Sequence, residues 1–214
     1  MSLTITVDLH PLLDVGAFVC RLATDLSSTP TPDELRVLAE PGAVAPLSPS
    51  EAVKTAVRDL LRHGGFKPAG RSKPASEYLT GALAEGRFPA INSLVDACNV
   101  VSLHAGLPIS LVDLDRVEGA LAVKIAPAGT TYPFNPTGQM IDVSGLVCLY
   151  DARGPTGTPV KDAQRTKTHD GTRNAVVIVW GTTALGDRTR VATRWDRELC
   201  TRIPGATVED VTLR

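Results

Sequence analysis

The feature that most constrains the fold is the run NAVVIVW, residues 174–180, in which four of the seven residues are valine or isoleucine. β-Branched side chains favour extended backbone, and a strand without polar alternation is typical of a sheet that is covered on both faces. The run therefore predicts a central strand, and the rest of the chain must supply the layers that cover it.

Other segments supply the remaining elements. Apolar patterning predicts further strands over 3–9, 120–126, 145–150 and 207–213, with an extended segment from Pro108. Helical spacing predicts helices over 49–63, 75–85, 93–105 and 187–202, with a short one over 31–39. The stretches 127–139 and 152–159 are rich in Gly and Pro and are interpreted as loops. Because strands and helices do not alternate regularly, the sequence predicts an α+β fold with a layered core.

Two helices carry clear end signals. For the first, we expect Ser48 to cap the helix, with Pro49 in its first position and Glu51 completing a capping box. For the helix over 93–105, we expect Asn92 at the start and Gly106 at the end.

Composition limits the classes of function. The 214 residues are 43% hydrophobic, enough for a sizeable core, and the net charge is −1, so any affinity for nucleic acid needs local basic patches. Aromatic residues make up 4% of the chain, which disfavours an extended base-stacking platform. The sequence lacks a secretory signal and any apolar run of about 18 residues, so we expect a soluble, cytoplasmic protein with no membrane partner.

Motifs for common chemistries are absent. The sequence contains no phosphate-binding G-x-x-x-x-G-K-[ST], no G-x-G-x-x-G after a strand, no G-x-S-x-G and no H-E-x-x-H. The four cysteines are widely spaced without C-x-x-C, which favours reduced thiols over a zinc site. The sequence predicts no metal and no cofactor. Catalytic residues stay unassigned, although a Ser/His/Asp group could still meet in space.

The stretch INSLVDACNVVSLHAGLPISLVDLDRV, residues 91–117, is apolar yet carries polar residues at regular intervals. One interpretation is structural: Asn92 caps the helix, Asp96 and Asn99 pin a loop to it, and Asp113 and Asp115 tie the following turn. The other is that these side chains form the wall of a binding pocket. The residues alone favour the structural interpretation for Asn92 and Asp96 without excluding the second.

This stretch resembles a motif of the B3/B4 module of the bacterial phenylalanyl-tRNA synthetase β chain, and TRNAVVIV, residues 172–179, resembles a downstream strand of that module. The resemblance covers roughly 71–181. It implies a layered β/β/α core of mixed sheets with flanking helices. We expect a single domain, 1–214, in which 1–70 form an N-terminal extension packed on a core at 71–181, and 182–214 add a helix and a strand.

In that family the module holds an editing site, where a wrongly attached tyrosine is hydrolysed from tRNA. By resemblance, the substrate pocket would be lined by Asn92, Asp96, Cys98, Asn99, Ser110, Asp113, Asn174 and Ile178. The chain departs from the family motif at Cys98, Ser110 and Ile178, where the family has Thr, His and Glu. Ile178 cannot accept a hydrogen bond, a loss on the order of 1–3 kcal/mol for a polar ligand, so a smaller or more apolar ligand is expected.

Two basic segments, 62–73 and 161–173, would make a phosphate groove if they converge. The RNA contacts predicted from them are Lys67, Arg71, Lys73, Arg165, Lys167 and Arg173. The leading hypothesis is a protein that binds tRNA or aminoacyl-tRNA at its 3′ end and hydrolyses mischarged tRNA in trans, without DNA specificity. The alternatives are a non-enzymatic module for a free amino acid, a small molecule or RNA, and a protein-interaction domain. The hypothesis expects the segments beginning at Ile91 and Asn174 to close around a shared cavity.

Overall fold

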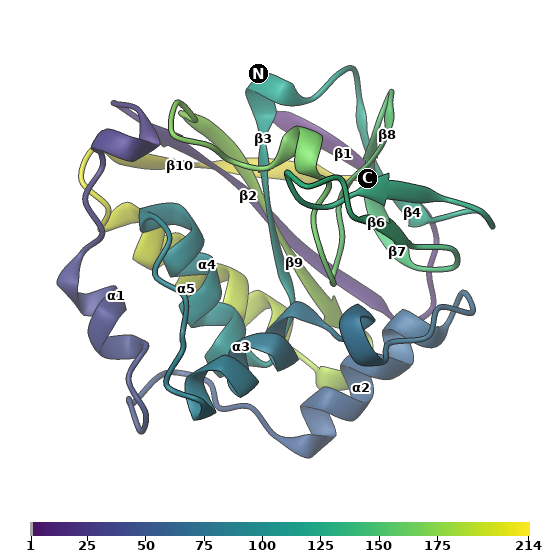
Figure 1. Cartoon of the computed structure of the whole chain (residues 1–214), viewed down its shortest axis with the longest axis horizontal. Helices are drawn as coiled ribbons and strands as arrows, with labels where there is room; N and C mark the ends of the chain where they lie inside the picture. Colours follow the sequence, from purple (N-terminus) through teal and green to yellow (C-terminus); the bar gives the residue numbers. More distant parts are fainter. Residues whose placement is uncertain (1) are drawn as a thin grey trace.

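The valine and isoleucine run forms most of β9 (Asn174–Thr182) in the computed structural model, which describes residues 2–214 (Figure 1). β9 pairs antiparallel with β3 (Ile109–Asp113) on one edge and with β2 (Leu13–Leu22) on the other. Residues 175–180 are all 0% exposed. The prediction of a central strand covered on both faces is confirmed.

One mixed sheet of eight strands contains β9. Its order is β3-β9-β2-β10-β1-β4-β7-β8, in which β1 is parallel to both β10 and β4 and all other neighbours are antiparallel. The remaining strands of this sheet are β1 (Leu3–Val7), β4 (Leu121–Ile125), β7 (Val147–Asp151), β8 (Gly154–Gly157) and β10 (Ala206–Leu213). A separate hairpin pairs β5 (Thr131–Pro133) with β6 (Met140–Asp142).

The sheet bends so that its two halves face each other across a first apolar core. Ile178 and Trp180 of β9 belong to the same buried cluster as Ile5 of β1, Leu121 of β4 and Leu149 of β7. The halves therefore form two β layers, although their strands are connected in one continuous order.

The helices cover the opposite face of β9 and form the third layer (Figure 1). They are α1 (Asp33–Leu38), α2 (Glu51–Arg62), α3 (Ala75–Ala84), α4 (Ser93–Ala105) and α5 (Arg188–Thr201). Short 3-10 turns lie at η1 (Leu26–Ser28), η2 (Gly70–Ser72), η3 (Leu114–Arg116), η4 (Gln164–Thr166) and η5 (Thr183–Leu185). Val177 and Val179 of β9 share a second core with Leu94 of α4 and Leu199 of α5. The α+β class with a layered β/β/α core is confirmed.

Three local expectations were wrong. β2 and β6 were not predicted as strands, and β5 and β8 fall in the stretches interpreted as loops. Ser50, rather than Ser48, caps α2, because its extended backbone lets the hydroxyl oxygen accept from the amide of Val53 at 3.2 Å.

A buried carboxyl group lies in the second core. Asp196 of α5 is 0% exposed, and within residues 2–214 its Oδ2 atom has no hydrogen-bond partner. The Cys200 thiol lies 3.8 Å from Oδ1, and the Cys98 thiol also faces this group. All four cysteines are free and buried. Burial raises the pKa of Asp196 to about 7, since the charged form is poorly solvated there.

We predict that Asp196→Asn removes a pH dependence of stability. Because the pKa rises from 3.8 to about 7 on folding, the native state holds a proton that the unfolded chain releases. The wild-type protein should lose stability from Asp196 as the pH rises between these values. The advantage of the variant in free energy of unfolding should grow by up to about 1.4 kcal/mol per pH unit and level off above that window. Urea denaturation at a series of pH values measures this, and a pH-independent difference between the two proteins would contradict it.

Candidate functional site

Polar residues at the start of α4 form hydrogen bonds that stabilise the local structure. The Asn92 side chain accepts a hydrogen bond from the amide of Val95 at 3.0 Å, which confirms it as the helix cap. The Asp96 carboxylate accepts from the amide of Ile91 at 2.8 Å and from the Thr31 hydroxyl at 3.3 Å, so it ties the N-terminal segment to α4. Asn99 is partly exposed on the same helix.

Ser110 is fully buried at the junction of the sheet edges. Its hydroxyl accepts from the Trp180 indole at 2.8 Å and donates to the Thr158 carbonyl at 3.0 Å. The hydroxyl also lies near the buried Asp162 carboxyl group, and the side chain has no exposed surface. Ser110 therefore acts as a structural partner of Trp180 in this structure.

The two remaining departures from the family motif lie in different cores. Ile178 packs in the cluster between the β layers, whereas Cys98 packs between the sheet and the helices. The segments 91–115 and 174–182 lie side by side through β3 and β9, but at these positions the side chains fill the space. The shared cavity expected between them is not formed by Cys98, Ser110 and Ile178.

Asp113 and Asn174 are also held by protein partners. Asp113 accepts from the amide of Asp115 at 2.9 Å and from the Thr172 hydroxyl at 2.6 Å. The Asn174 amide donates to the Asp115 carboxylate, and its oxygen accepts from Arg21 at 2.8 Å. Of the eight residues predicted for the pocket, Asp96 lines one of the two cavities described below and the other seven line neither.

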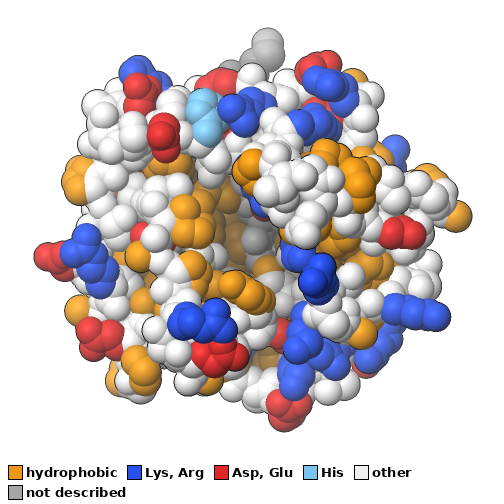
Figure 2. Space-filling model, in the orientation of Figure 1, with side chains coloured by type: hydrophobic (Ala, Val, Ile, Leu, Met, Phe, Trp, Pro, Cys, Tyr) orange, Lys and Arg blue, Asp and Glu red, His pale blue; other side chains and the backbone are white. Residues whose placement is uncertain are grey.

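A cavity, here called the basic cavity, opens between α3, the β5–β6 hairpin and the loop before η4. Its volume is about 610 Å³. Figure 2 shows a hollow on this face of the molecule with Lys and Arg side chains along its border. The residues that line the basic cavity are Gly70, Arg71, Lys73, Ala75, Glu77, Tyr78, Gly81, Ala82, Glu85, Arg87, Phe134, Asn135, Val160, Lys161 and Lys167.

In the described part of the chain, the basic cavity carries cations that form no ion pairs, although the buried Asp162 carboxyl group lies near Lys167. Within residues 2–214, Arg71, Lys73, Lys161 and Lys167 form no ion pair. The two acids in the lining are already paired, since Glu77 binds Arg58 at 2.6 Å and Glu85 binds Arg87. The cavity therefore presents unneutralised cations from two segments that are distant in sequence.

Phe134 organises the two lysines. The Lys167 ammonium donates to the Phe134 carbonyl at 2.5 Å, and the Lys161 ammonium lies 4.0 Å from the centre of the Phe134 ring. Burial lowers the pKa of Lys161, and the nearby charges of Arg71 and Lys167 add to this effect. Burial also lowers the pKa of Lys167. An anion in the basic cavity would relieve the repulsion among these cations.

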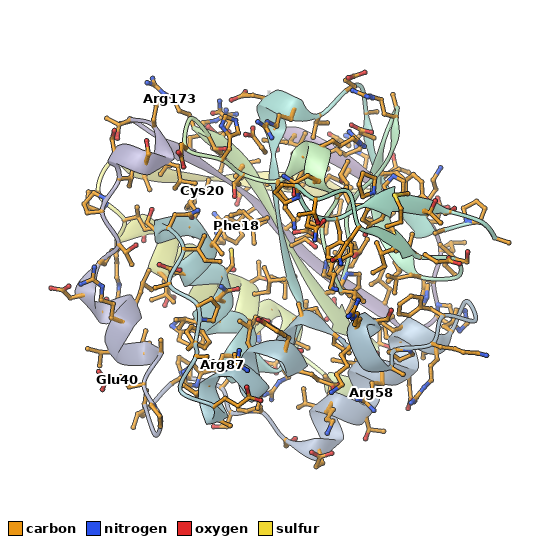
Figure 3. All side chains as sticks on the ribbon, in the orientation of Figure 1. Phe18, Cys20, Glu40, Arg58, Arg87 and Arg173 are labelled. Carbon is orange, nitrogen blue, oxygen red and sulfur yellow. The ribbon has the colours of Figure 1, made fainter. Side chains whose placement is uncertain are left out.

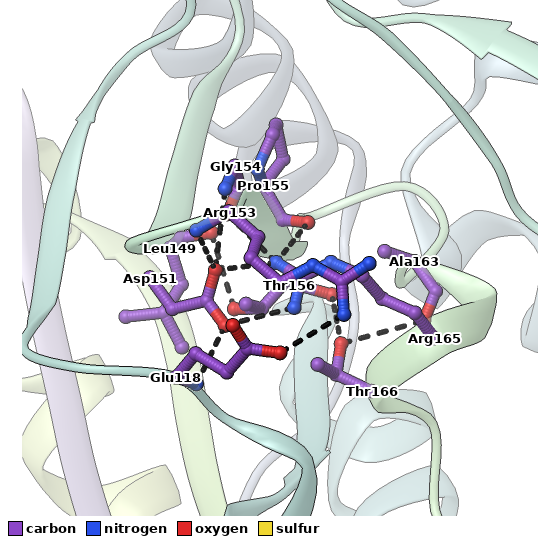
Figure 4. A network of polar contacts seen from close by, with 10 residues as sticks. All are labelled: Glu118, Leu149, Asp151, Arg153, Gly154, Pro155, Thr156, Ala163, Arg165 and Thr166. Carbon is purple, nitrogen blue, oxygen red and sulfur yellow. Dashed lines mark hydrogen bonds and ion pairs between the residues drawn. The ribbon is translucent and has the colours of Figure 1, made fainter.

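Arg165 lies outside the basic cavity. Its guanidinium binds Asp151 through two bonds of 2.8 and 2.6 Å and donates to the carbonyl of Gly154 at 3.0 Å (Figure 4). Although burial opposes it, the Arg165 guanidinium holds the pKa of Asp151 below its usual range. This pair joins η4 to the β7–β8 hairpin, so it positions the loop that carries Lys161 and Lys167.

The predicted contacts Lys67 and Arg173 also fall outside the basic cavity. Lys67 is exposed in the segment before η2. Arg173 pairs with Asp25 at 2.6 Å, and Figure 3 shows Arg173 at the end of the molecule opposite Arg87. The two basic segments thus converge through Arg71, Lys73 and Lys167, with Lys161 as an additional member.

The chain belongs to the B3/4 domain family, whose pattern matches residues 67–212. A curated relative is the phenylalanine–tRNA ligase beta subunit of Streptomyces avermitilis. It is 32% identical over 118 residues, which cover 53% of this chain and 14% of that protein. The chain thus spans a small part of the relative's length.

A solved structure was also matched. It is an N-terminal fragment of the phenylalanyl-tRNA synthetase beta subunit from Pyrococcus horikoshii, with a TM-score of 0.48 and 13% identity. The match covers 59% of this chain and 45% of that one.

Two further features of residues 2–214 bear on other kinds of site. No helix there is long and apolar enough to cross a membrane. In the same part of the chain, no group of three or more His, Cys, Asp or Glu side chains is arranged to hold a metal ion.

We predict that Asn92→Ala lowers the free energy of unfolding by about 1 kcal/mol, because the amide of Val95 loses its capping partner. Asn99→Ala is the matched control, since Asn99 is partly exposed on the same helix, and should change stability by less than about 0.5 kcal/mol. Chemical denaturation measures both. An Asn92 variant with wild-type stability but impaired ligand binding would instead assign Asn92 to a site.

Proposed function

We propose that this protein binds RNA and that the basic cavity receives the acceptor end of a tRNA. The observation that carries the proposal is the group of cations without ion-pair partners, Arg71, Lys73, Lys161 and Lys167, around one cavity. Lysine and arginine neutralise backbone phosphates and release counterions, which supplies most of the affinity for nucleic acid.

The dimensions and remaining groups of the basic cavity support a nucleotide end. A volume of about 610 Å³ lies within the common range for small-ligand sites, ~300–1,000 Å³. Tyr78 is 65% exposed at the border and offers a ring on which a base can stack. The Asn135 side-chain oxygen already accepts from the Thr137 hydroxyl and the Gln139 amide, and its nitrogen donates to the Gln139 side chain, which leaves one N–H group to donate to a sugar or base.

The family relation supports tRNA as the class of RNA. The curated relative is named as a subunit of a tRNA ligase, and the B3/4 pattern covers the segments that build the basic cavity. Recognition of the aminoacylated 3′ end is the specific form of the proposal, because a single cavity accommodates a chain terminus more readily than a continuous duplex.

Hydrolysis of mischarged tRNA in trans is a separate step beyond binding. Ser110, which could have oriented a water molecule, has 0% exposure, and its hydroxyl contacts the Thr158 carbonyl and lies near the buried Asp162 carboxyl group. The geometry therefore supports binding better than catalysis. Release of the amino acid can be measured in the same samples as binding.

We predict that replacing both Arg71 and Lys161 by Gln weakens tRNA binding by roughly tenfold at low salt, because two phosphates lose their cationic partners. The slope of log K against log salt should become shallower by about 0.9 for each phosphate that is no longer neutralised. Neither side chain forms an ion pair within residues 2–214, so the fold should be retained. Fluorescence anisotropy with a labelled tRNA at several salt concentrations measures both quantities.

The matched control is the double variant Arg153→Gln and Arg173→Gln, which removes the same charge from surface ion pairs outside the basic cavity. It should bind tRNA nearly as the wild type does. Equal losses of affinity in the two double variants would remove the basic cavity from the proposal. Release of amino acid from a panel of mischarged tRNAs, above the rate in buffer, would extend the function to hydrolysis.

A further inference from the structure

A second cavity, here called the apolar cavity, is separate from the proposed RNA site. It lies between α1 with the segment that follows it, the C-terminal end of α3 and the start of α4, and its volume is about 290 Å³. Its lining is Thr31, Leu35, Arg36, Ala39, Glu40, Pro41, Leu83, Gly86, Phe88, Pro89, Ala90, Asp96 and Val100. It shares no lining residue with the basic cavity.

Much of this wall comes from outside the family match. Residues 31–41 supply six of the lining residues, whereas the B3/4 pattern begins at residue 67. The apolar cavity therefore exists because the N-terminal segment of this chain packs against α3 and α4. Glu40, at the outer end of α1 in Figure 3, lies at the border of the cavity.

One buried carboxylate faces this apolar surrounding. Asp96 is 8% exposed, and within residues 2–214 it forms no ion pair, although the charge of Arg36 in the same lining acts on it from a greater distance. One oxygen accepts from the amide of Ile91 and the other from the Thr31 hydroxyl at 3.3 Å, and the Asn92 amide also interacts with the carboxylate, which leaves capacity for a further donor. Burial raises the pKa of this carboxyl group because its charged form is poorly solvated, so a nearby cation would stabilise the charged form. A cationic group on a ligand would supply the missing partner.

The other polar groups lie at the border. Arg36 is paired with Asp33 at 3.3 Å, and the Arg36 side chain is 70% exposed, so it remains in solvent while it contributes to the lining. The interior walls are hydrocarbon, from Leu35, Phe88 and Val100. This arrangement favours a ligand with one charged end and an apolar body.

We infer that the apolar cavity binds a small apolar amine, whose ammonium group donates to Asp96 and whose hydrocarbon part lies between Leu35, Phe88 and Val100. A volume of about 290 Å³ is at the lower end of the range for ligand sites, so the amine has about the size of an amino acid. Two sources share this chemistry: a simple alkylamine, and an apolar amino acid whose carboxylate meets Arg36.

The test compares three ligands. The reference is 3-methylbutylamine; 3-methylbutanol replaces its amine by a hydroxyl group, and L-leucine adds a carboxylate to it. Calorimetric titration of the full chain should give saturable binding of the amine, the amino acid or both, with at least tenfold weaker binding of the alcohol. Tighter binding of leucine would identify the amino acid as the source, and tighter binding of 3-methylbutylamine would identify the simple amine. Equal binding of the alcohol and the better amine, or no binding of either amine, would overturn the inference.

Variants test whether the amine binds in the apolar cavity. Asp96→Asn should weaken amine binding at least about tenfold without a comparable effect on the alcohol, because only the charge pair is lost. Asp187→Asn, on the surface at the start of α5 and outside the lining of the apolar cavity, is the matched control and should change the affinity less than about threefold. Ala39→Leu fills the cavity without altering Asp96, so it tests the site independently if Asp96→Asn does not fold. Unchanged amine affinity in a folded Asp96→Asn or Ala39→Leu variant would overturn the inference.

The outcome is independent of the RNA proposal. The Arg71→Gln and Lys161→Gln double variant should keep its amine affinity, and Asp96→Asn should keep its tRNA affinity. Loss of both activities in either variant would point to a general folding defect, which denaturation curves identify.

Discussion

The burial of β9 between two apolar layers is the constraint on which the rest of the structure depends. Successive side chains of a strand point to opposite faces, and here both faces are covered. Val177 and Val179 pack under the helices, while Ile178 and Trp180 pack against the opposing β layer. A polar group on this strand would lose its hydration on either face. The two cavities therefore lie among the helices and loops around the sheet.

Close approach of α5 secures this arrangement. A Cβ atom at Gly16 of β2 would lie 1.9 Å from the Thr193 hydroxyl, and one at Gly181 of β9 would lie 1.9 Å from the Thr189 hydroxyl. The two threonines are one helical turn apart, so the pair of glycines lets α5 lie directly on two neighbouring strands. Ion pairs then hold the cavity walls: Arg58 with Glu77 joins α2 to α3, and Arg165 fixes the loop before β9.

The sequence predicted the parts of the fold that depend on local pattern. β9, the Asn92 cap and the layered α+β class follow from residue type and spacing alone. β2 was missed because Asp14 and Gly16 interrupt its apolar pattern. Glycine is needed at position 16 because Thr193, far along the chain, leaves no room for a Cβ atom. Likewise, Arg165 and Arg173 could not be separated from Arg71 by composition, because Asp151 and Asp25 neutralise them through contacts between distant segments. The apolar cavity depends on the packing of α1 against α4, a contact that no sequence motif predicts.

The positions inferred from the family resemblance carry residues that suit a filled interior. A carboxylate at position 178 would lie among Ile5, Leu121 and Leu149 with no cation in that cluster, so isoleucine there is consistent with a filled interior. The Trp180 indole occupies the same cluster and needs one acceptor for its N–H group. Ser110 supplies it at 2.8 Å. These side chains satisfy one another, so the proposals of binding rest on the basic and apolar cavities, where Arg71, Lys161 and Asp96 have no ion-pair partner within residues 2–214.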